Sequence, residues 1–338
     1  MEERFAKIEL GQRGFNLADA PDHFSRYRTD PTAYALDVLG MQWWHGQSEI
    51  ADALLEHKRV FVRAGNGPGK TSCAAGLVNW FFDCFDPGIC ISTAPTTQQL
   101  SDALWRQIRS MRRGRSGLMP KAPHLEGNNE HWAAGYTAAN PEAFQGRHKE
   151  PLFIIFDEAV GIDRVFWEAA EGMQPTYWLC LMNPTDASSH AYQEESSGRW
   201  HTIRINSLDH PNVVDELEGR PRPYPQSSLT LAWIRERIAA WCSTPAIVDE
   251  ALGDFLFDGV WYRPGPLFEA RVLGKWPSQT TDSIWSESLW DLCCRQRDNT
   301  GLGETLQLGC DVARFGDDQT VIVVRRGPRV LMVESLSG

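Results

Sequence analysis

The sequence lacks any run of apolar residues long enough to cross a membrane. Its N-terminus, MEERFAKIELGQRGF, has no apolar segment of the kind found in secretory signals. The eight cysteines are scattered, and no two of them form a C-x-x-C pair. This spacing argues against a disulfide scaffold and a zinc site, and it is typical of reduced thiols in the core of a cytosolic protein. We therefore expect no membrane partner.

Positive charge is also scarce. The 33 Lys and Arg residues are outnumbered by 44 Asp and Glu residues, which leaves a net charge of −11. This balance argues against a surface that is basic all over, although a local basic strip would still suffice to bind nucleic acid. The length of 338 residues and the hydrophobic content of 42% suit two domains with sizeable cores.

The stretch FVRAGNGPGKTSC, residues 61–73, has the order that a phosphate-binding loop needs: strand, glycine-rich loop, helix. Glycines let successive N–H groups point at one anion, and the following helix adds the positive end of its dipole. We expect Lys70 to reach the β- and γ-phosphates of ATP and Thr71 to bind Mg²⁺. The residues predicted to bind ATP here are Ala64, Gly65, Asn66, Gly67, Pro68, Gly69, Lys70 and Thr71.

This loop departs from the pattern G-x-x-x-x-G-K-[ST] at one position, because the first glycine is replaced by Ala64. Alanine is tolerated there if its backbone keeps a negative φ. The alternative interpretation is a glycine-rich turn that happens to precede Lys-Thr.

A second motif follows the apolar run 152–156, which is predicted to be a central parallel strand. The run ends in Asp157 and Glu158, and carboxylates at the end of a parallel strand lie where ligands bind in this architecture. We expect Asp157 to hold Mg²⁺, directly or through water, and Glu158 to polarise the attacking water. The alternative is an exposed acidic pair.

Two further segments are candidates for nucleotide contacts. A glutamine at the start of the helix before the loop can read the adenine edge, and Gln47 is the first candidate and Gln42 the second. At the end of the predicted strand 177–182, Asn183 is the first candidate for sensing the γ-phosphate and Thr185 the second. An Asn-Pro turn without such a role explains the second segment equally well.

The end of the predicted helix 98–113 is basic. Arg106, Arg109, Arg112 and Arg113 are predicted to contact DNA phosphates, and Arg115 and Lys121 continue the run. A solvated helix face is the alternative. Further helices are predicted at 31–39, 229–241 and 245–255, and further strands at 88–94, 131–139 and 201–206. Residues 120–131 are predicted to form a loop and residues 207–212 a turn.

The last segment is predicted to form strands at 306–311, 320–324 and 330–334. It is similar to the opening meander of an RNase H-like fold, with Asp311 as the first metal-binding acid. Two-metal cleavage of a phosphodiester needs several converging carboxylates. Because the sequence ends at Gly338, before later strands could supply them, we expect this polypeptide alone to lack appreciable nuclease activity.

Together, and in the order in which they occur along the chain, these segments resemble those of one family. This family is the large terminase subunits of tailed phages, which package DNA into proheads. The resemblance runs from about residue 30 to the end. The matching segments are Gln47, GNGPGKT (65–71), TAPTTQQLSDALW (93–105), FQGRH (144–148), FDEAVG (156–161), MNPT (182–185), LDHPN (208–212), ARVLGKWP (270–277) and CDVARFGDD (310–318).

The resemblance implies an α/β fold: a P-loop ATPase of the additional-strand, catalytic-Glu type with a mainly parallel sheet, followed by the first strands of an RNase H-like nuclease domain. The expected organisation is an N-terminal arm at 1–30, the ATPase domain at 31–277 with a lid region at about 190–275, a linker at 278–300, and the start of the nuclease domain at 301–338.

The resemblance also implies function. Gln47 would contact adenine, Lys70 and Thr71 would hold phosphate and Mg²⁺, Asp157 and Glu158 would be the Walker B pair, and Asn183 would belong to the coupling motif. Many members carry an arginine inside the phosphate loop, and residues 65–69 contain none. Arg63 and Arg147 are the candidates for stabilising charge in its place, in cis or across a subunit boundary.

The partners implied are double-stranded DNA, the portal protein of the prohead, the small terminase subunit and further copies of the chain in a ring on the portal. The implied location is the bacterial host cytoplasm, transiently on the prohead, and the nuclease site would use Mg²⁺ or Mn²⁺. Two rival functions remain open: a helicase or recombination ATPase on the same core, and a docking module that holds nucleotide without hydrolysing it.

Overall fold

A computed structural model of the chain describes residues 24–118, 123–127, 130–137, 150–277, 305–313, 319–327 and 329–337. The chain divides into two units, Met1–Thr281 and Asp282–Gly338. The division falls inside the stretch that the sequence predicts to be a linker. Most of the predicted N-terminal arm lies outside the described residues, but the short turn η2 (Ser25–Tyr27) packs its Tyr27 ring into the core.

The described part of the first unit is built on a seven-stranded sheet with the order β3-β4-β2-β5-β6-β1-β7. Neighbouring strands are parallel except for β3 and β4. The central strands are continuous apolar runs because both faces of the sheet are covered. The strands are β1 (Arg59–Ala64), β2 (Ile89–Ala94), β3 (His124–Glu126), β4 (Trp132–Thr137), β5 (Leu152–Asp157), β6 (Tyr177–Met182) and β7 (His201–Ile205).

One strand separates the two predicted phosphate-site strands. Strand β6 lies between β1, which leads into the glycine-rich loop, and β5, which ends in Asp157. The register pairs Arg63 with Met182 and Asp157 with Leu181, so all three strands end at the same edge of the sheet. This is the additional-strand arrangement, and it confirms the predicted α/β class of the first unit.

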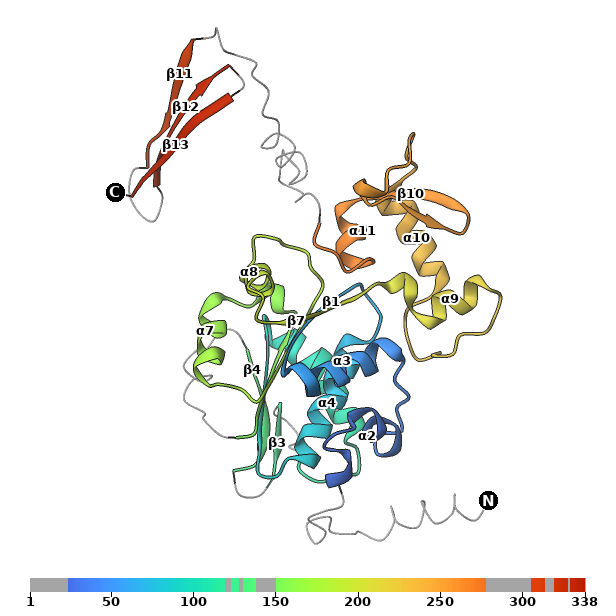
Figure 1. Cartoon of the computed structure of the whole chain (residues 1–338). Helices are drawn as coiled ribbons and strands as arrows, with labels where there is room; N and C mark the ends of the chain where they lie inside the picture. The colour runs from blue at the N-terminus through green and yellow to red at the C-terminus, as the bar shows by residue number, and fades with distance from the viewer. Residues whose placement is uncertain are drawn as a thin grey trace. The chain divides into compact units, whose positions relative to one another are not determined.

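Helices cover both faces of this sheet (Figure 1). One face packs against α2 (Pro31–Asp37), α3 (His45–His57), α4 (Lys70–Cys84) and α5 (Arg106–Met111). The other packs against α7 (Arg164–Gly172) and α8 (His190–Ser196). The alternation along β1 produces this division, because Val60 and Val62 face the first layer while Phe61 faces the second.

A smaller cluster of elements follows β7, and we call residues 207–273 the lid subdomain. Its own apolar core includes Ile234, Ile238 and Phe268. Its elements are the short turns η5 (Ser207–Asp209) and η6 (Glu250–Leu252), the helices α9 (Pro211–Leu217), α10 (Leu231–Trp241) and α11 (Pro266–Arg271), and the strands β8 (Cys242–Ser243), β9 (Phe255–Phe257) and β10 (Val260–Pro264).

The second unit contains an antiparallel three-stranded sheet with the order β11-β12-β13. Its strands are β11 (Leu306–Asp311), β12 (Gln319–Arg326) and β13 (Arg329–Ser337). The predicted meander is therefore present. Its assignment to an RNase H-like domain stays a prediction.

Several predicted elements are corrected. The helix predicted at 245–255 is wrong, because this stretch forms the turn η6 and the start of β9. There the carboxylate of Asp254 accepts from the backbone N–H of Asp249 at 2.8 Å and from Arg263. The predicted loop 120–131 contains the edge strand β3, and helices α8 and α9 are absent from the prediction. The predicted helix 98–113 consists of a π-helical segment, η3 (Gln99–Trp105), followed by α5.

No helix in the described ranges combines the length and the apolar character that crossing a membrane would require.

Candidate nucleotide-binding site

The glycine-rich loop lies on a cleft of about 930 Å³ at the carboxyl edge of the sheet. Most of the predicted ATP contacts line it, together with residues of α5 and of the lid subdomain. The lining residues are Gly40, Met41, Gln42, Trp43, Trp44, Gln47, Asn66, Gly67, Pro68, Gly69, Lys70, Thr71, Ser72, Arg106, Gln107, Glu158, Asn183, His210, Pro223, Tyr224, Gln226, Ser227 and Ser228.

The loop has the backbone of an anion cradle. Gly67 and Gly69 adopt positive φ values of 84° and 91°, which only glycine adopts readily. Ala64 is the last residue of β1 and keeps an extended backbone, so the missing first glycine is not needed. Helix α4 starts at Lys70, so its free N–H groups face the cleft.

Lys70 is buried, and its ammonium donates to the carbonyls of Gly65 at 2.9 Å and Ala64 at 3.4 Å. Burial lowers the pKa of Lys70, and the nearby carboxylates of Glu158 and Asp157 oppose that shift. The structure thus brings together the three charged groups that the sequence predicts at one nucleotide.

The carboxylate of Asp157 fits a cation. Its side chain is buried, and its Oδ1 atom has no hydrogen-bond partner among the described residues. Burial, together with the negative charge of Glu158, raises the pKa of Asp157 to about 7, while Lys70 acts in the opposite direction. A divalent cation beside Thr71 and Asp157 would satisfy the orphaned oxygen, because Mg²⁺ prefers hydroxyl and carboxylate oxygens.

Glu158 has an unusual backbone. Its φ of 53° and ψ of 48° lie in the left-handed region, which a residue other than glycine enters rarely and at a cost of about 1–3 kcal/mol. Strain of this kind clusters at functional sites. The conformation directs the half-buried side chain into the cleft, whereas Asp157 stays behind it.

Asn183 joins the tip of β6 to the loop. Its amide donates to the carbonyl of Ala64 at 2.6 Å, the same carbonyl that Lys70 reaches. Asn183 and Lys70 therefore share one acceptor, so a change in the hydrogen bonds of Lys70 would also change the hydrogen bond of Asn183. Thr185 is exposed and does not line the cleft.

The amide of Gln47 contacts the loop rather than facing open space. Its Nε2 donates to the carbonyl of Gly69 at 3.0 Å, and its Oε1 accepts from the backbone N–H of Trp44 at 3.4 Å. The indole of Trp44 donates to the carbonyl of Pro68 at 2.8 Å. In this conformation Gln47 braces the loop, and its predicted contact with adenine stays a prediction.

A clamp between the loop and the lid subdomain has no counterpart in the predictions from sequence. The backbone N–H of Asn66 donates to the carbonyl of Arg271 at 2.6 Å, and its carbonyl accepts from the Ser207 hydroxyl at 3.0 Å. The backbone N–H of Gly65 donates to the carbonyl of Ile205 at 3.1 Å. Nucleotide-dependent movement of the loop would therefore reach both ends of the lid subdomain.

No protein-family model matches the sequence, and no curated protein does. Among solved structures, the ATPase domain of the large terminase of Thermus phage P74-26 aligns with a TM-score of 0.50 and 15% identity, covering 73% of this chain and 98% of that domain. The chain has the fold of a phage large-terminase ATPase domain.

The large terminase of another thermophilic bacteriophage, solved in complex with ADP, aligns with a TM-score of 0.45 and 14% identity over 88% of this chain. The chain spans 64% of the length of that protein. The UvsW helicase of bacteriophage T4 aligns with a TM-score of 0.35 and 12% identity, over 48% of this chain and 60% of the helicase.

The basic strip, Arg106, Arg109, Arg112 and Arg113, has side chains in different environments. The predicted DNA contact of Arg112 is contradicted by the structure. Its side chain is 2% exposed, and it is paired with Asp83 of helix α4 at 2.9 Å and bound to Asn79 at 3.2 Å. Arg113 is exposed, Arg109 is half-buried, and Arg106 reaches the nucleotide cleft.

Arg63 is a candidate for stabilising the phosphate charge in cis or across a subunit boundary; the structure contradicts the role in cis, and the role across a boundary stays a prediction. It does not line the cleft, and its guanidinium lies 2.7 Å from the carboxylate of Glu195 on α8. The same carboxylate accepts from the indole of Trp276 at 2.5 Å. The alternation along β1 explains this, because Arg63 lies on the face that packs against α7 and α8. The other candidate, Arg147, lies outside the described residues.

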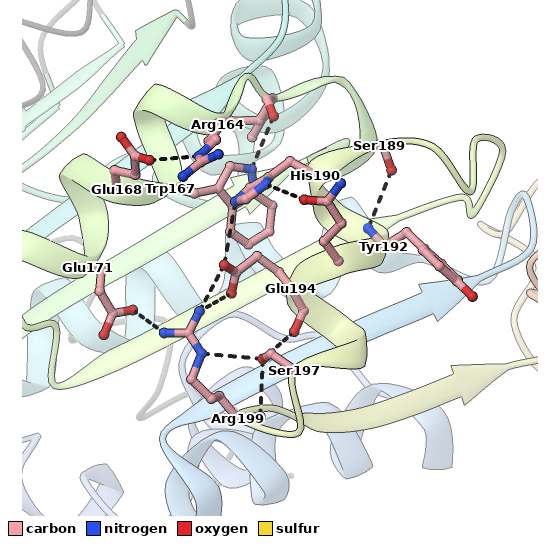
Figure 2. Close-up of polar contacts among 12 residues, drawn as sticks. Arg164, Trp167, Glu168, Glu171, Ser189, His190, Tyr192, Glu194, Ser197 and Arg199 are labelled. Carbon is pink, nitrogen blue, oxygen red and sulfur yellow. Dashed lines mark hydrogen bonds and ion pairs between the residues drawn. The ribbon is translucent and has the colours of Figure 1, made fainter. Parts of the chain in front are cut away.

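A cluster of paired charges covers that same face (Figure 2). Arg199 joins α7 to α8, since it lies 3.3 Å from Glu171 and donates to Glu194 at 2.7 Å. Glu171 also accepts from Arg59 on strand β1 at 2.8 Å. These pairs lie around a pocket of about 340 Å³ lined by Trp167. Because its charges are paired with one another, the cluster packs the two helices and is not assigned a ligand.

In the second unit, Asp311 is exposed at the end of β11. In the described ranges, no cluster of three acids, histidines or cysteines that could hold a metal forms around it or elsewhere. Its role in a nuclease site stays a prediction.

Proposed function

We propose that this chain is the ATP-hydrolysing motor of a phage packaging machine, which moves double-stranded DNA into a prohead. One observation carries the proposal: the ammonium of Lys70, the carboxylate of Glu158 and the glycine-rich loop line one cleft, and the buried carboxylate of Asp157 lies behind them, close enough to act on Lys70. The sheet order, with β6 between the two phosphate-site strands, supports the same conclusion.

Different groups of the chain bind the phosphates, position the attacking water and hold Mg²⁺. The loop N–H groups and Lys70 bind and orient the phosphates, so hydrolysis starts from a fixed geometry. Glu158, held in the cleft by its left-handed backbone, accepts hydrogen bonds from the attacking water and aligns it. Thr71 and Asp157 would hold Mg²⁺, which neutralises charge on the phosphates when bound.

Loss of the terminal phosphate changes what Lys70 contacts. Asn183 shares the carbonyl of Ala64 with Lys70, so it is placed to respond to that change. The clamp at Asn66 passes loop movement to the lid subdomain. The remaining partners of the proposal are the portal protein, the small terminase subunit and further copies of the chain in a ring. The bacterial host cytoplasm and the prohead are the proposed locations.

The test is phosphate release by the purified chain with Mg²⁺ and ATP. Glu158→Gln is expected to lower turnover by at least about 100-fold, because it removes the base, while nucleotide still binds. Glu168→Gln is the matched control, since Glu168 is an exposed acid on α7 outside the cleft. Near-normal turnover in Glu158→Gln would refute its role, and wild-type binding without phosphate release would favour a docking module.

Coupling to DNA needs a separate measurement. Wild-type chain with proheads, ATP and linear duplex is expected to protect DNA from added nuclease, and Glu158→Gln is expected to abolish that protection. ATP hydrolysis without protection would leave an ATPase with another purpose. Cutting of duplex DNA with Mg²⁺ or Mn²⁺, lost in Asp311→Ala, would contradict the expectation that this polypeptide alone has no appreciable nuclease activity.

A further inference from the structure

Arg106 occupies a different environment from the rest of the basic strip. It is the first residue of α5, it is exposed, and it lines the cleft together with Thr71 and Glu158. Its backbone N–H bonds to the carbonyls of Ala103 and Ser101, but no hydrogen bond or ion pair joins its guanidinium to another described residue. An unpaired guanidinium that lines a cleft together with a phosphate-type loop points to an anionic ligand inside that cleft.

The surrounding structure holds α5 in place at both ends. Before Arg106, the buried Trp105 ends the π-helical segment; its indole donates to Ser92 at 3.0 Å and packs where a side chain on Gly135 would collide. After α5, Arg112 is paired with Asp83 near the far end of α4. Helix α5 therefore runs alongside α4, with Arg106 at the cleft end.

The other positively charged side chain of the cleft, Lys70, already donates a hydrogen bond to the loop. Among the described lining residues only Lys70 and Arg106 are lysine or arginine, and Lys70 is buried against the carbonyl of Gly65. Arg106 approaches from the side of β2, which is the neighbour of β5 and its Glu158 tip. Tyr224 of the lid subdomain lines the cleft as well and comes from the chain beyond β7. Arg106 thus shares the cleft lining with Thr71 and Glu158, the side chains that the proposed function assigns to Mg²⁺ and to the attacking water.

We propose that Arg106 contacts the terminal phosphate of the nucleotide bound by its own subunit, an inference that depends on the proposed ATPase function. A guanidinium can donate two parallel hydrogen bonds to phosphate oxygens, and it stabilises the charge that spreads over them during transfer. Arg106 thereby distinguishes a triphosphate from a diphosphate. The exposed Arg113, which does not line the cleft, stays a candidate for contact with DNA.

The test compares Arg106→Ala, Arg106→Lys and the control Arg113→Ala. Dissociation constants for ADP and for ATPγS are measured by calorimetry with Mg²⁺, and duplex DNA affinity is measured without nucleotide. Arg106→Ala is expected to weaken ATPγS at least about tenfold and ADP less than about twofold. Arg106→Lys, which keeps the charge without the fork, should fall between wild type and Arg106→Ala.

Unchanged ATPγS affinity in Arg106→Ala would overturn the inference. So would a loss of DNA affinity as large as that in Arg113→Ala with nucleotide binding intact, because Arg106 would then be a DNA contact. A failure of the ATPase proposal would be visible in the wild type, as nucleotide binding without phosphate release. A failure of the inference alone leaves wild-type hydrolysis intact and Arg106→Ala equal to it.

Discussion

The side-chain amide of Gln47 holds the carbonyl of Gly69 at 3.0 Å, directly before the lysine of the phosphate loop. Gln47→Glu removes this donor and sets a carboxylate against the carbonyl, so we expect ATP affinity to fall at least about tenfold. Gln193→Glu, at an exposed position of α8 outside the cleft, is the control. Equal losses for ATP and GTP would indicate bracing of the loop, whereas a loss confined to ATP would indicate reading of the base.

The second prediction concerns Gly65. A Cβ atom at this position would meet the Ser207 hydroxyl and lie 2.5 Å from the carbonyl of Val272 and 3.0 Å from that of Arg271. Gly65→Ala is therefore expected to push the lid subdomain from the loop and to lower both nucleotide affinity and turnover by about tenfold. Gly172→Ala, at the end of α7 with nothing within 4 Å, is the control. Wild-type kinetics in Gly65→Ala would show that the clamp has no functional role.

The third prediction separates Arg112 from Arg113. Arg112→Ala leaves the largely buried carboxylate of Asp83 without one of its partners and removes a guanidinium that lies 4.4 Å from the centre of the Phe82 ring. The free energy of unfolding in urea is expected to fall by about 3 kcal/mol or more. Arg113→Ala, at an exposed position, should change it by less than about 0.5 kcal/mol. A stable Arg112→Ala variant with weakened DNA binding would restore the sequence-based prediction.

The fourth prediction concerns pH. Burial lowers the pKa of His210 to about 4, and the rings of Trp44 at 4.9 Å and Tyr224 at 6.0 Å, both uncharged, pack against it. Its Nδ1 accepts from the backbone N–H of Asn212 at 3.2 Å, which caps α9. Unfolding takes up a proton between about pH 6.5 and 4, so His210 makes the protein less stable as the pH falls through this range, by about 2 kcal/mol at pH 5.

His210→Asn keeps an oxygen acceptor for the cap and removes the titration, so its unfolding free energy should vary less between about pH 7 and pH 5. Urea denaturation at several pH values measures this. His45→Asn, at an exposed position at the start of α3, is the control. An unchanged pH profile in His210→Asn would assign the acid sensitivity to other groups.

Local patterns in the sequence were sufficient for the centre of the fold. The hydrophobicity of the run before Asp157 and the conformational freedom of the glycines around Gly67 are properties of the individual residues. Both motifs are found where the sequence predicts them. The sheet edge then brings Lys70 and Glu158 together, because the carboxyl ends of parallel strands meet there.

Pairings between distant residues could not be predicted in the same way. Arg112 belongs to a basic run in the sequence, and only the folded chain brings Asp83 to it. The helix predicted at 245–255 failed because the tertiary pairing of Asp254 with Arg263 decides that segment. Likewise, the hydrogen bond from the Ser207 hydroxyl to the carbonyl of Asn66 could not be predicted, because neither local sequence indicates it.

The chain leaves the core at Ser207 and returns at Arg271, and both points are bonded to Asn66. A body fastened at two neighbouring points turns about the line that joins them and resists displacement in other directions. Asn66, which is bonded to both points, therefore defines a pivot for the lid subdomain. A small shift of Asn66 would produce a larger displacement at the end of the lid subdomain farthest from it.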